Sequence, residues 1–205
     1  KHVHLFVTIN INLLIYLDYR FYLMEVIITG AIIVKKNVTN CFNTLGGVSW
    51  LWANSPLHRN WPVSLLAINT LPAIRCNQYA LLMKDGFPVA FCSWANLSLK
   101  NEIKYLNNVT SLLAEDWTSG ERKWFIDWIA PFGDSKYLYK HMRDMYPYDL
   151  FRAIRVNPKT NTGKISEFHG GKIDKRLASR IFRQYHNELI NEAKKMKSFK
   201  FSFSG

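Results

Sequence analysis

Residues 122–130 read RKWFIDWIA and predict a β-strand that is covered on both faces. Strict alternation puts three residues on each face, with Trp124, Ile126 and Trp128 on one and Phe125, Asp127 and Ile129 on the other. A buried carboxylate without a partner is costly, and such groups cluster at active sites. Asp127 is therefore either a functional residue or a structural one, which pairs with an arginine such as Arg122 or Arg155 or caps backbone amides.

Further strands are predicted on both sides of this stretch. The runs Gln78–Lys84 and Phe87–Trp94 flank Asp85-Gly86, and an Asp-Gly pair between two apolar runs indicates a β-hairpin. Two more strands are expected at Leu150–Val156 and Gly163–Phe168, separated by turn-forming residues.

Helices are predicted between these strands. Periodic apolar residues indicate them over Leu45–Asn54, from Ser98 to about Leu106, from Asp134 to about Met145, and over Ile173–Met196. We expect the last helix to bury six residues: Leu177, Ile181, Phe182, Tyr185, Leu189 and Ile190. The apolar run from Val63 to Leu71 is expected to meet a bend or a sheet edge at Pro72. The predicted fold class is α+β, a mixed and mostly antiparallel sheet flanked by helices.

Charge and composition exclude some classes of protein and favour others. The 205 residues carry a formal charge of +12, and 48% are hydrophobic, which excludes disorder over most of the length. Half of the excess charge lies in Lys172–Gly205, so an acidic partner is expected. Cys41, Cys76 and Cys92 form no CxxC pair, which favours a reducing compartment without disulfides or structural zinc.

The amino-acid composition changes near residue 44. We interpret residues 1–43 as an N-terminal extension and residues 44–205 as the functional domain. The extension is apolar, but Asp18, Arg20 and Glu25 interrupt it, so no membrane span is predicted. Asn10 and Asn12 interrupt the first apolar run and no A-x-A cleavage site follows, so no signal peptide is predicted. Met24 lies inside it, and we expect the native start there.

Four residues are candidates for chemistry. His58 and Ser55 lie in the polar loop Asn54–Pro62, which contains two prolines, and loops on rigid scaffolds often carry catalytic groups. His58 is otherwise a surface residue, and Ser55, which no nucleophile-elbow motif surrounds, is otherwise a helix cap. Asn69 could donate to a developing oxyanion or be a satisfied core amide. Together with Asp127 these are the predicted site residues. No metal-ligand spacing and no nucleotide-binding fingerprint is found.

Six strings resemble one known family. They are VSWLWA (48–53), SPLHRNWP (55–62), FCSWANL (91–97), AEDWTSG (114–120), WFIDWIAPFG (124–133) and FHGGK (168–172). Together they resemble the RTX toxin-activating lysine acyltransferases, the hemolysin-activating proteins of Gram-negative bacteria. The resemblance runs from about Leu45 to the C-terminus, and the extension before it has no counterpart.

The resemblance implies a fold similar to the Gcn5-related acetyltransferases. It also implies a cytoplasmic, homodimeric enzyme without a cofactor, which moves a fatty acyl chain from acyl carrier protein to internal lysines of an RTX protoxin. The family's catalytic histidine falls on His58 and its catalytic aspartate on Asp127. His58 is then a general base or a covalent acyl carrier, and Asp127 orients it.

The chemistry of the residues agrees with that implication. A lysine amine has a pKa of about 10.4, so freeing it at pH 7 costs roughly 4 to 5 kcal/mol and needs a base. The Arg/Gln-x-x-Gly-x-Gly/Ala turn that holds coenzyme A in Gcn5-like enzymes does not occur here. A carrier protein is therefore the expected donor, and the basic segment Lys172–Lys200 is its expected docking face. Two other readings, a nucleic-acid-binding protein and a non-catalytic chaperone for an acidic secreted partner, are less well supported.

Overall fold

The computed structural model describes residues 26–29, 32–157 and 162–195, with side chains over 40–155 and 163–195. The chain divides into two compact units, residues 1–42 and 43–205. In the first, β1 (Val26–Thr29) pairs antiparallel with β2 (Ile32–Lys35). The start expected at Met24 lies outside the described residues and stays a prediction.

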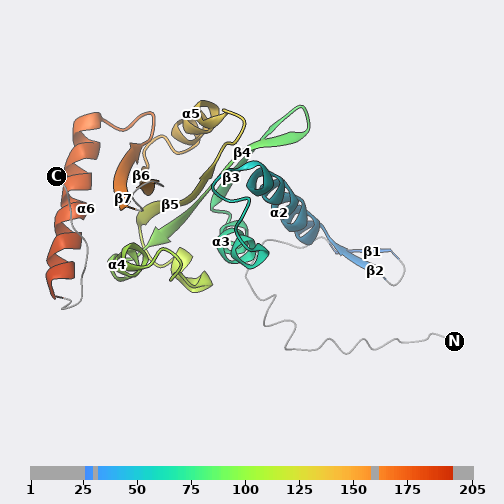
Figure 1. The fold of residues 1–205 in the computed structure, drawn as a ribbon, viewed down its shortest axis with the longest axis horizontal. Coiled ribbons are helices and arrows are strands. Elements are labelled where there is room, and N and C mark those ends of the chain that lie inside the picture. Colours follow the sequence, from blue (N-terminus) through green and yellow to red (C-terminus); the bar gives the residue numbers. More distant parts are fainter. Residues whose placement is uncertain (1–25, 30–31, 158–161, 196–205) are drawn as a thin grey trace. The chain divides into compact units, whose positions relative to one another are not determined.

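A five-stranded sheet forms the body of the second unit. Its strands lie side by side in the order β3 (Tyr79–Lys84), β4 (Phe87–Leu97), β5 (Arg122–Ile129), β6 (Leu150–Asn157) and β7 (Thr162–His169) (Figure 1). Neighbouring strands are antiparallel except for β5 and β6, which are parallel. This confirms the predicted α+β class and the hairpin at Asp85-Gly86, and it is consistent with a Gcn5-related fold.

The helices confirm most of the sequence prediction. They are α2 (Lys36–Asn54), α3 (Val63–Arg75), α4 (Leu99–Asn107), α5 (Ser135–Met145) and α6 (Lys175–Lys195), with a short 3-10 helix, η1 (Ala114–Trp117). Helix α2 begins nine residues before the predicted Leu45. Helix α4 begins where expected, because the Ser98 side chain accepts a hydrogen bond from the backbone N–H of Asn101.

The prediction of a bend or a sheet edge at Pro72 is wrong. Pro72 lies inside α3, whose buried residues include Leu66, Thr70 and Ala73. These residues recur every three or four positions, so one face of a helix buries them together. The proline lies in the last turns, where it removes only one backbone hydrogen bond before the helix ends at Arg75.

A β-bulge changes the predicted faces of β5. Ser93 pairs with Asp127 and Trp94 with Phe125, which leaves Ile126 as an extra residue. Phe125 and Trp128 therefore share a face, with ring centroids 5.0 Å apart, whereas Asp127 and Ile129 face the opposite layer. The expectation that Asp127 shares a face with Phe125 is wrong, because strict alternation stops at the bulge.

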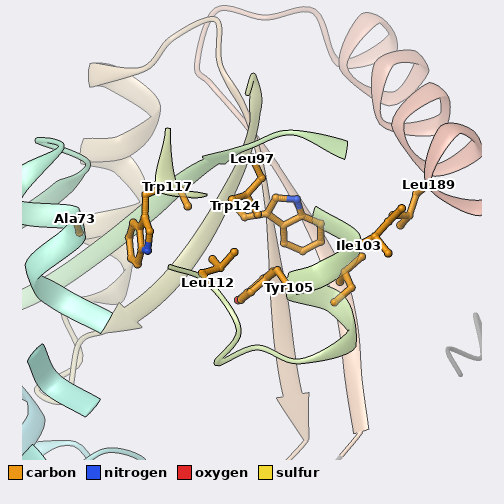
Figure 2. Close-up of a cluster of buried hydrophobic side chains, with 10 residues drawn as sticks. Ala73, Leu97, Ile103, Tyr105, Leu112, Trp117, Trp124 and Leu189 are labelled. Carbon is orange, nitrogen blue, oxygen red and sulfur yellow. The ribbon is translucent and has the colours of Figure 1, made fainter. Parts of the chain in front are cut away.

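Both faces of the sheet are covered by helices. On one face, buried side chains of β4 and β5 pack against α2, α3, α4 and α6. Figure 2 shows Trp124 there, with Tyr105, Ile103 and Leu189 around it. On the other face, Leu138 and Met142 of α5 are buried against the sheet. Of the six residues expected to be buried in α6, Phe182 and Leu189 are, whereas Leu177 is exposed.

A buried charge cluster joins α4, β5, β6 and α6. Glu102 of α4 is fully buried; it accepts hydrogen bonds from Arg122 at 2.9 Å and Trp124 at 2.8 Å, and it pairs with Arg152. Arg122 also pairs with Glu188 of α6. Burial raises the pKa of Glu102, and the charges of Arg152 and Arg122 oppose that rise. Because Arg122 and Arg152 lie on neighbouring strands, Glu102 fixes β5 and β6 where they pair.

This cluster predicts a large loss of stability on removal of one charge. Glu102→Gln leaves Arg152 buried without its counter-charge and Arg122 with Glu188 alone, and breaking a buried pair costs about 3–5 kcal/mol. Denaturant unfolding measures that loss. Glu192→Gln, which breaks the exposed pair with Lys195, is the control and is expected to cost less than about 0.5 kcal/mol. Equal losses in the two variants would contradict the account.

Candidate active site

The fold brings His58 and Asp127 together from positions 69 residues apart. His58 lies in the loop between α2 and α3, and Asp127 lies on β5 next to the bulge. The His58 Nε2 and Asp127 Oδ1 atoms are 3.4 Å apart. The two residues are only 3% and 6% exposed, so both groups meet inside the protein. This contact is what the sequence reading required if both residues belong to one site.

Ser55 contacts the second ring nitrogen of His58, Nδ1. Its Oγ lies 2.8 Å from His58 Nδ1, and both side chains are buried. The local chain explains the closeness, since α2 ends at Asn54 before Pro56 and the backbone N–H groups of His58 and Arg59 both bond to the Ser55 carbonyl. The turn thus holds the serine and the histidine in a fixed relation.

Two tryptophans enclose the imidazole. The ring centroid of His58 lies 5.0 Å from that of Trp52 and 4.7 Å from that of Trp61. Trp52 is buried on α2, whereas Trp61 in the loop is 36% exposed. This enclosure was not predicted from the sequence. The available signal was a tryptophan on each side of the loop histidine, six residues before it and three residues after it.

The hydrogen bonds leave two arrangements of protons. In one, Nε2–H donates to Asp127 and the Ser55 hydroxyl donates to Nδ1. In the other, Nδ1–H donates to Ser55, and Nε2 keeps a free lone pair that faces the carboxylate. A serine hydroxyl serves both, because it can donate or accept. The second arrangement makes Nε2 available as a base.

Asp127 also influences a neighbouring phenol. Burial raises the pKa of Tyr105, and the charge of the Asp127 carboxylate raises it further. Tyr105 is therefore neutral at physiological pH, and its ring packs against Trp124 with centroids 5.8 Å apart.

Asn69, the fourth predicted site residue, lies in a different place. It lines a small hollow between α3 and the segment around η1, together with Ile68, Thr110, Trp117 and Ile126. In the described part of the chain it forms no hydrogen bond with Ser55, His58 or Asp127. The structure thus brings three of the four residues together, and the role of Asn69 stays a prediction.

The parallel strands separate beside the site. β5 pairs with β6 only from Lys123 to Phe125, opposite Phe151 to Ala153. From Ile126 onward, β5 has no paired residue on β6 within the described strands. On the side of β5 that faces β6, the backbone next to Asp127 therefore has no partner strand within the described residues.

The described residues contain neither a cluster of metal ligands nor a helix suited to span a membrane. No group of three or more His, Cys, Asp or Glu residues is placed to hold a metal ion there. No helix in that part of the chain has the length and apolar character to cross a membrane.

The sheet is consistent with a Gcn5-related fold, and its central strand, β5, carries the carboxylate that contacts the loop histidine. Comparison with known proteins identifies the family: residues 37–169 match the RTX toxin acyltransferase family, and the chain belongs to it. Membership makes this protein an acyltransferase and confirms the resemblance found in the sequence.

Three curated relatives illustrate the match. The chain is 70% identical over 169 residues to "Protein-lysine myristoyltransferase HlyC" of Escherichia coli, which covers 82% of this chain and 99% of the relative. It is 72% identical over 163 residues to "RTX-I toxin-activating lysine-acyltransferase ApxIC" of Actinobacillus pleuropneumoniae, covering 80% and 95%. It is 70% identical over 161 residues to "Leukotoxin-activating lysine-acyltransferase LtxC" of Aggregatibacter actinomycetemcomitans, covering 78% and 95%.

The enclosure of His58 predicts slow chemical modification. Diethyl pyrocarbonate should modify His58 several-fold faster in Trp61→Ala than in the parent protein, because the substitution exposes the imidazole. Peptide mass spectrometry reads the rate at His58 alone. Trp50→Ala, which removes an exposed tryptophan from α2, is the matched control. If both variants react at the parent rate, Trp61 does not shield the ring.

Proposed function

We propose that this protein is a protein-lysine fatty acyltransferase that activates an RTX protoxin. It transfers an acyl chain from acyl carrier protein to internal lysines of the protoxin, with His58 as general base and Asp127 orienting it. The observation that carries the proposal is the buried contact of 3.4 Å between His58 Nε2 and Asp127 Oδ1. The printed names of the relatives, lysine acyltransferases and a myristoyltransferase, support the reaction class.

The long contact between His58 and Asp127 suits an entering amine. A distance of 3.4 Å is at the weak end of the hydrogen-bond range, whereas the Ser55 contact at 2.8 Å is of normal length. A lysine ammonium that enters beside Nε2 can donate one proton to that nitrogen and another to the carboxylate. Ser55 meanwhile accepts Nδ1–H, which keeps the imidazole in the basic tautomer.

The transfer step then balances. The lysine ammonium gives a proton to His58 Nε2, and the free amine attacks the thioester carbonyl carbon of the donor. A C–N bond forms, the C–S bond breaks, and the thiol of the carrier leaves with a proton. The imidazolium formed in this step is stabilised by Asp127, as a carboxylate stabilises the cation in other catalytic triads.

The donor is proposed to bind where β5 and β6 separate. From Ile126 the edge of β5 is free of pairing with β6, so its backbone groups are available to an extended thioester arm. This edge is adjacent in sequence to Asp127. In this proposal no metal or bound cofactor takes part.

The carrier itself is proposed to dock on α6. Lys175, Arg176, Arg180 and Arg183 line one exposed hollow on this helix, and acyl carrier protein has an acidic surface. Charge complementarity of this kind raises the rate of encounter. The cytoplasm, where acyl carrier protein and an unsecreted protoxin meet, is the proposed location, and a homodimer is the proposed assembly.

Loss of either central group should abolish transfer. His58→Ala and Asp127→Asn are each expected to lower acylation of a co-expressed protoxin about 10²- to 10⁴-fold, the usual contribution of a positioned base. Mass spectrometry of fatty-acyl adducts on protoxin lysines measures it. Binding of the protoxin should be retained, since neither change alters the surface.

Two outcomes would alter this account. Transfer at the parent rate in folded Asp127→Asn would make Asp127 a structural residue. An acyl adduct trapped on His58 would make the imidazole a covalent carrier instead of a base.

Charge reversal on α6 should weaken donor binding. Arg176→Glu combined with Arg180→Glu is expected to raise KM for the acylated carrier protein several-fold, with kcat unchanged and the effect reduced by salt. The matched control is Lys136→Glu with Lys140→Glu, two exposed lysines at the same spacing on α5. Equal KM changes in both pairs would show that net charge, and not a docking face, controls the affinity.

A further inference from the structure

Ser93 is a polar residue in an apolar row of β4. Along this strand, Phe91, Ala95 and Leu97 pack into the clusters beneath α2, α3 and α4, whereas Cys92 and Trp94 pack on the opposite face. Alternation therefore directs Ser93 toward the same layer as Phe91 and Ala95. Ser93 is fully buried, so this serine stands in the hydrophobic core with no exposure to solvent.

The residue opposite Ser93 is Asp127. The two are paired across β4 and β5, immediately before the register shift at the bulge. Directly opposed residues of an antiparallel pair have Cβ atoms about 4.5–5.5 Å apart and project from the same face. Both side chains therefore lie under the loop that carries His58.

Each of these two side chains has a polar atom without a partner. Asp127 Oδ1 contacts His58, but Asp127 Oδ2 is buried and forms no hydrogen bond with the described residues. Ser93 Oγ is likewise buried and unpartnered in that part of the chain. A buried carboxylate oxygen and a buried hydroxyl are both costly to leave unsatisfied. One is only an acceptor and the other can donate, so each supplies what the other lacks.

We infer that Ser93 is a positioning residue of the active site, which donates its hydroxyl to Asp127 Oδ2 directly or through one water. Rotation about χ1 moves the Oγ atom of Ser93, so the hydroxyl can turn toward Asp127 Oδ2. The bond holds the carboxylate plane so that Oδ1 remains directed at His58 Nε2. Ser93 does not touch the substrate and acts through Asp127. This inference rests on the proposed function of Asp127.

The test is the kinetics of Ser93→Ala. Loss of one hydrogen bond to a charged group is expected to lower kcat about tenfold to a hundredfold, with KM for the protoxin unchanged. Ser93→Cys, which keeps the size and a weak donor, should fall between the parent and Ser93→Ala. Thr70→Val, which removes another fully buried hydroxyl without a partner, is the matched control and should retain the parent rate.

The Asp127→Asn background separates a positioning role from a merely structural one. If Ser93 acts through Asp127, Ser93→Ala causes no further loss in that background. An equal loss in both backgrounds, or a parent rate for Ser93→Ala, overturns the inference. If Asp127→Asn is inactive, the proposed function stands whatever the result for Ser93→Ala. If Asp127→Asn is fully active, the proposed function and the inference about Ser93 both fail.

Discussion

A carboxylate buried in the core of the sheet is the constraint on which the rest of this molecule depends. Asp127 is 6% exposed, and its Oδ1 lies 3.4 Å from the imidazole of His58. Several features of the fold serve that contact. The bulge at Ile126 turns Asp127 toward the layer of α2 and α3, the turn after α2 supplies Ser55 and His58, and Trp52 and Trp61 enclose the ring. Without an imidazole beside it, neither oxygen of the buried carboxylate would have a hydrogen-bond partner among the described residues.

A second feature of the scaffold beside the site is the separation of β5 from β6. The strands pair for only three residues, and Glu102 bridges Arg122 and Arg152 at the paired end. The buried charges thus secure the strands where they meet, while the edge beyond Phe125 remains open. In the proposed function, this unpaired edge beside Asp127 would hold the thioester in a fixed position relative to the base.

The sequence predicts much of this arrangement and misses what depends on tertiary contacts. The hairpin at Asp85-Gly86 and strand β5 were predictable, because turn chemistry and alternation are local signals. The pairing of His58 with Asp127 was expected from the family resemblance, since no local signal connects residues 69 positions apart. The bulge was not, since one extra residue in β5 is defined only by its partner strand. Helix α3 was missed because Pro72 was given more weight than apolar periodicity. Ser93 was missed because its meaning comes from the residue opposite it.

The most direct test of the account is a double-mutant cycle between His58 and Asp127 in protoxin acylation. If the two groups act as one unit, the double variant His58→Ala/Asp127→Asn transfers acyl groups within about twofold of the slower single variant, since the second change removes nothing that still works. If the losses of the two single variants multiply in the double variant, the histidine and the aspartate act independently. In that case the buried contact between them is not the basis of catalysis.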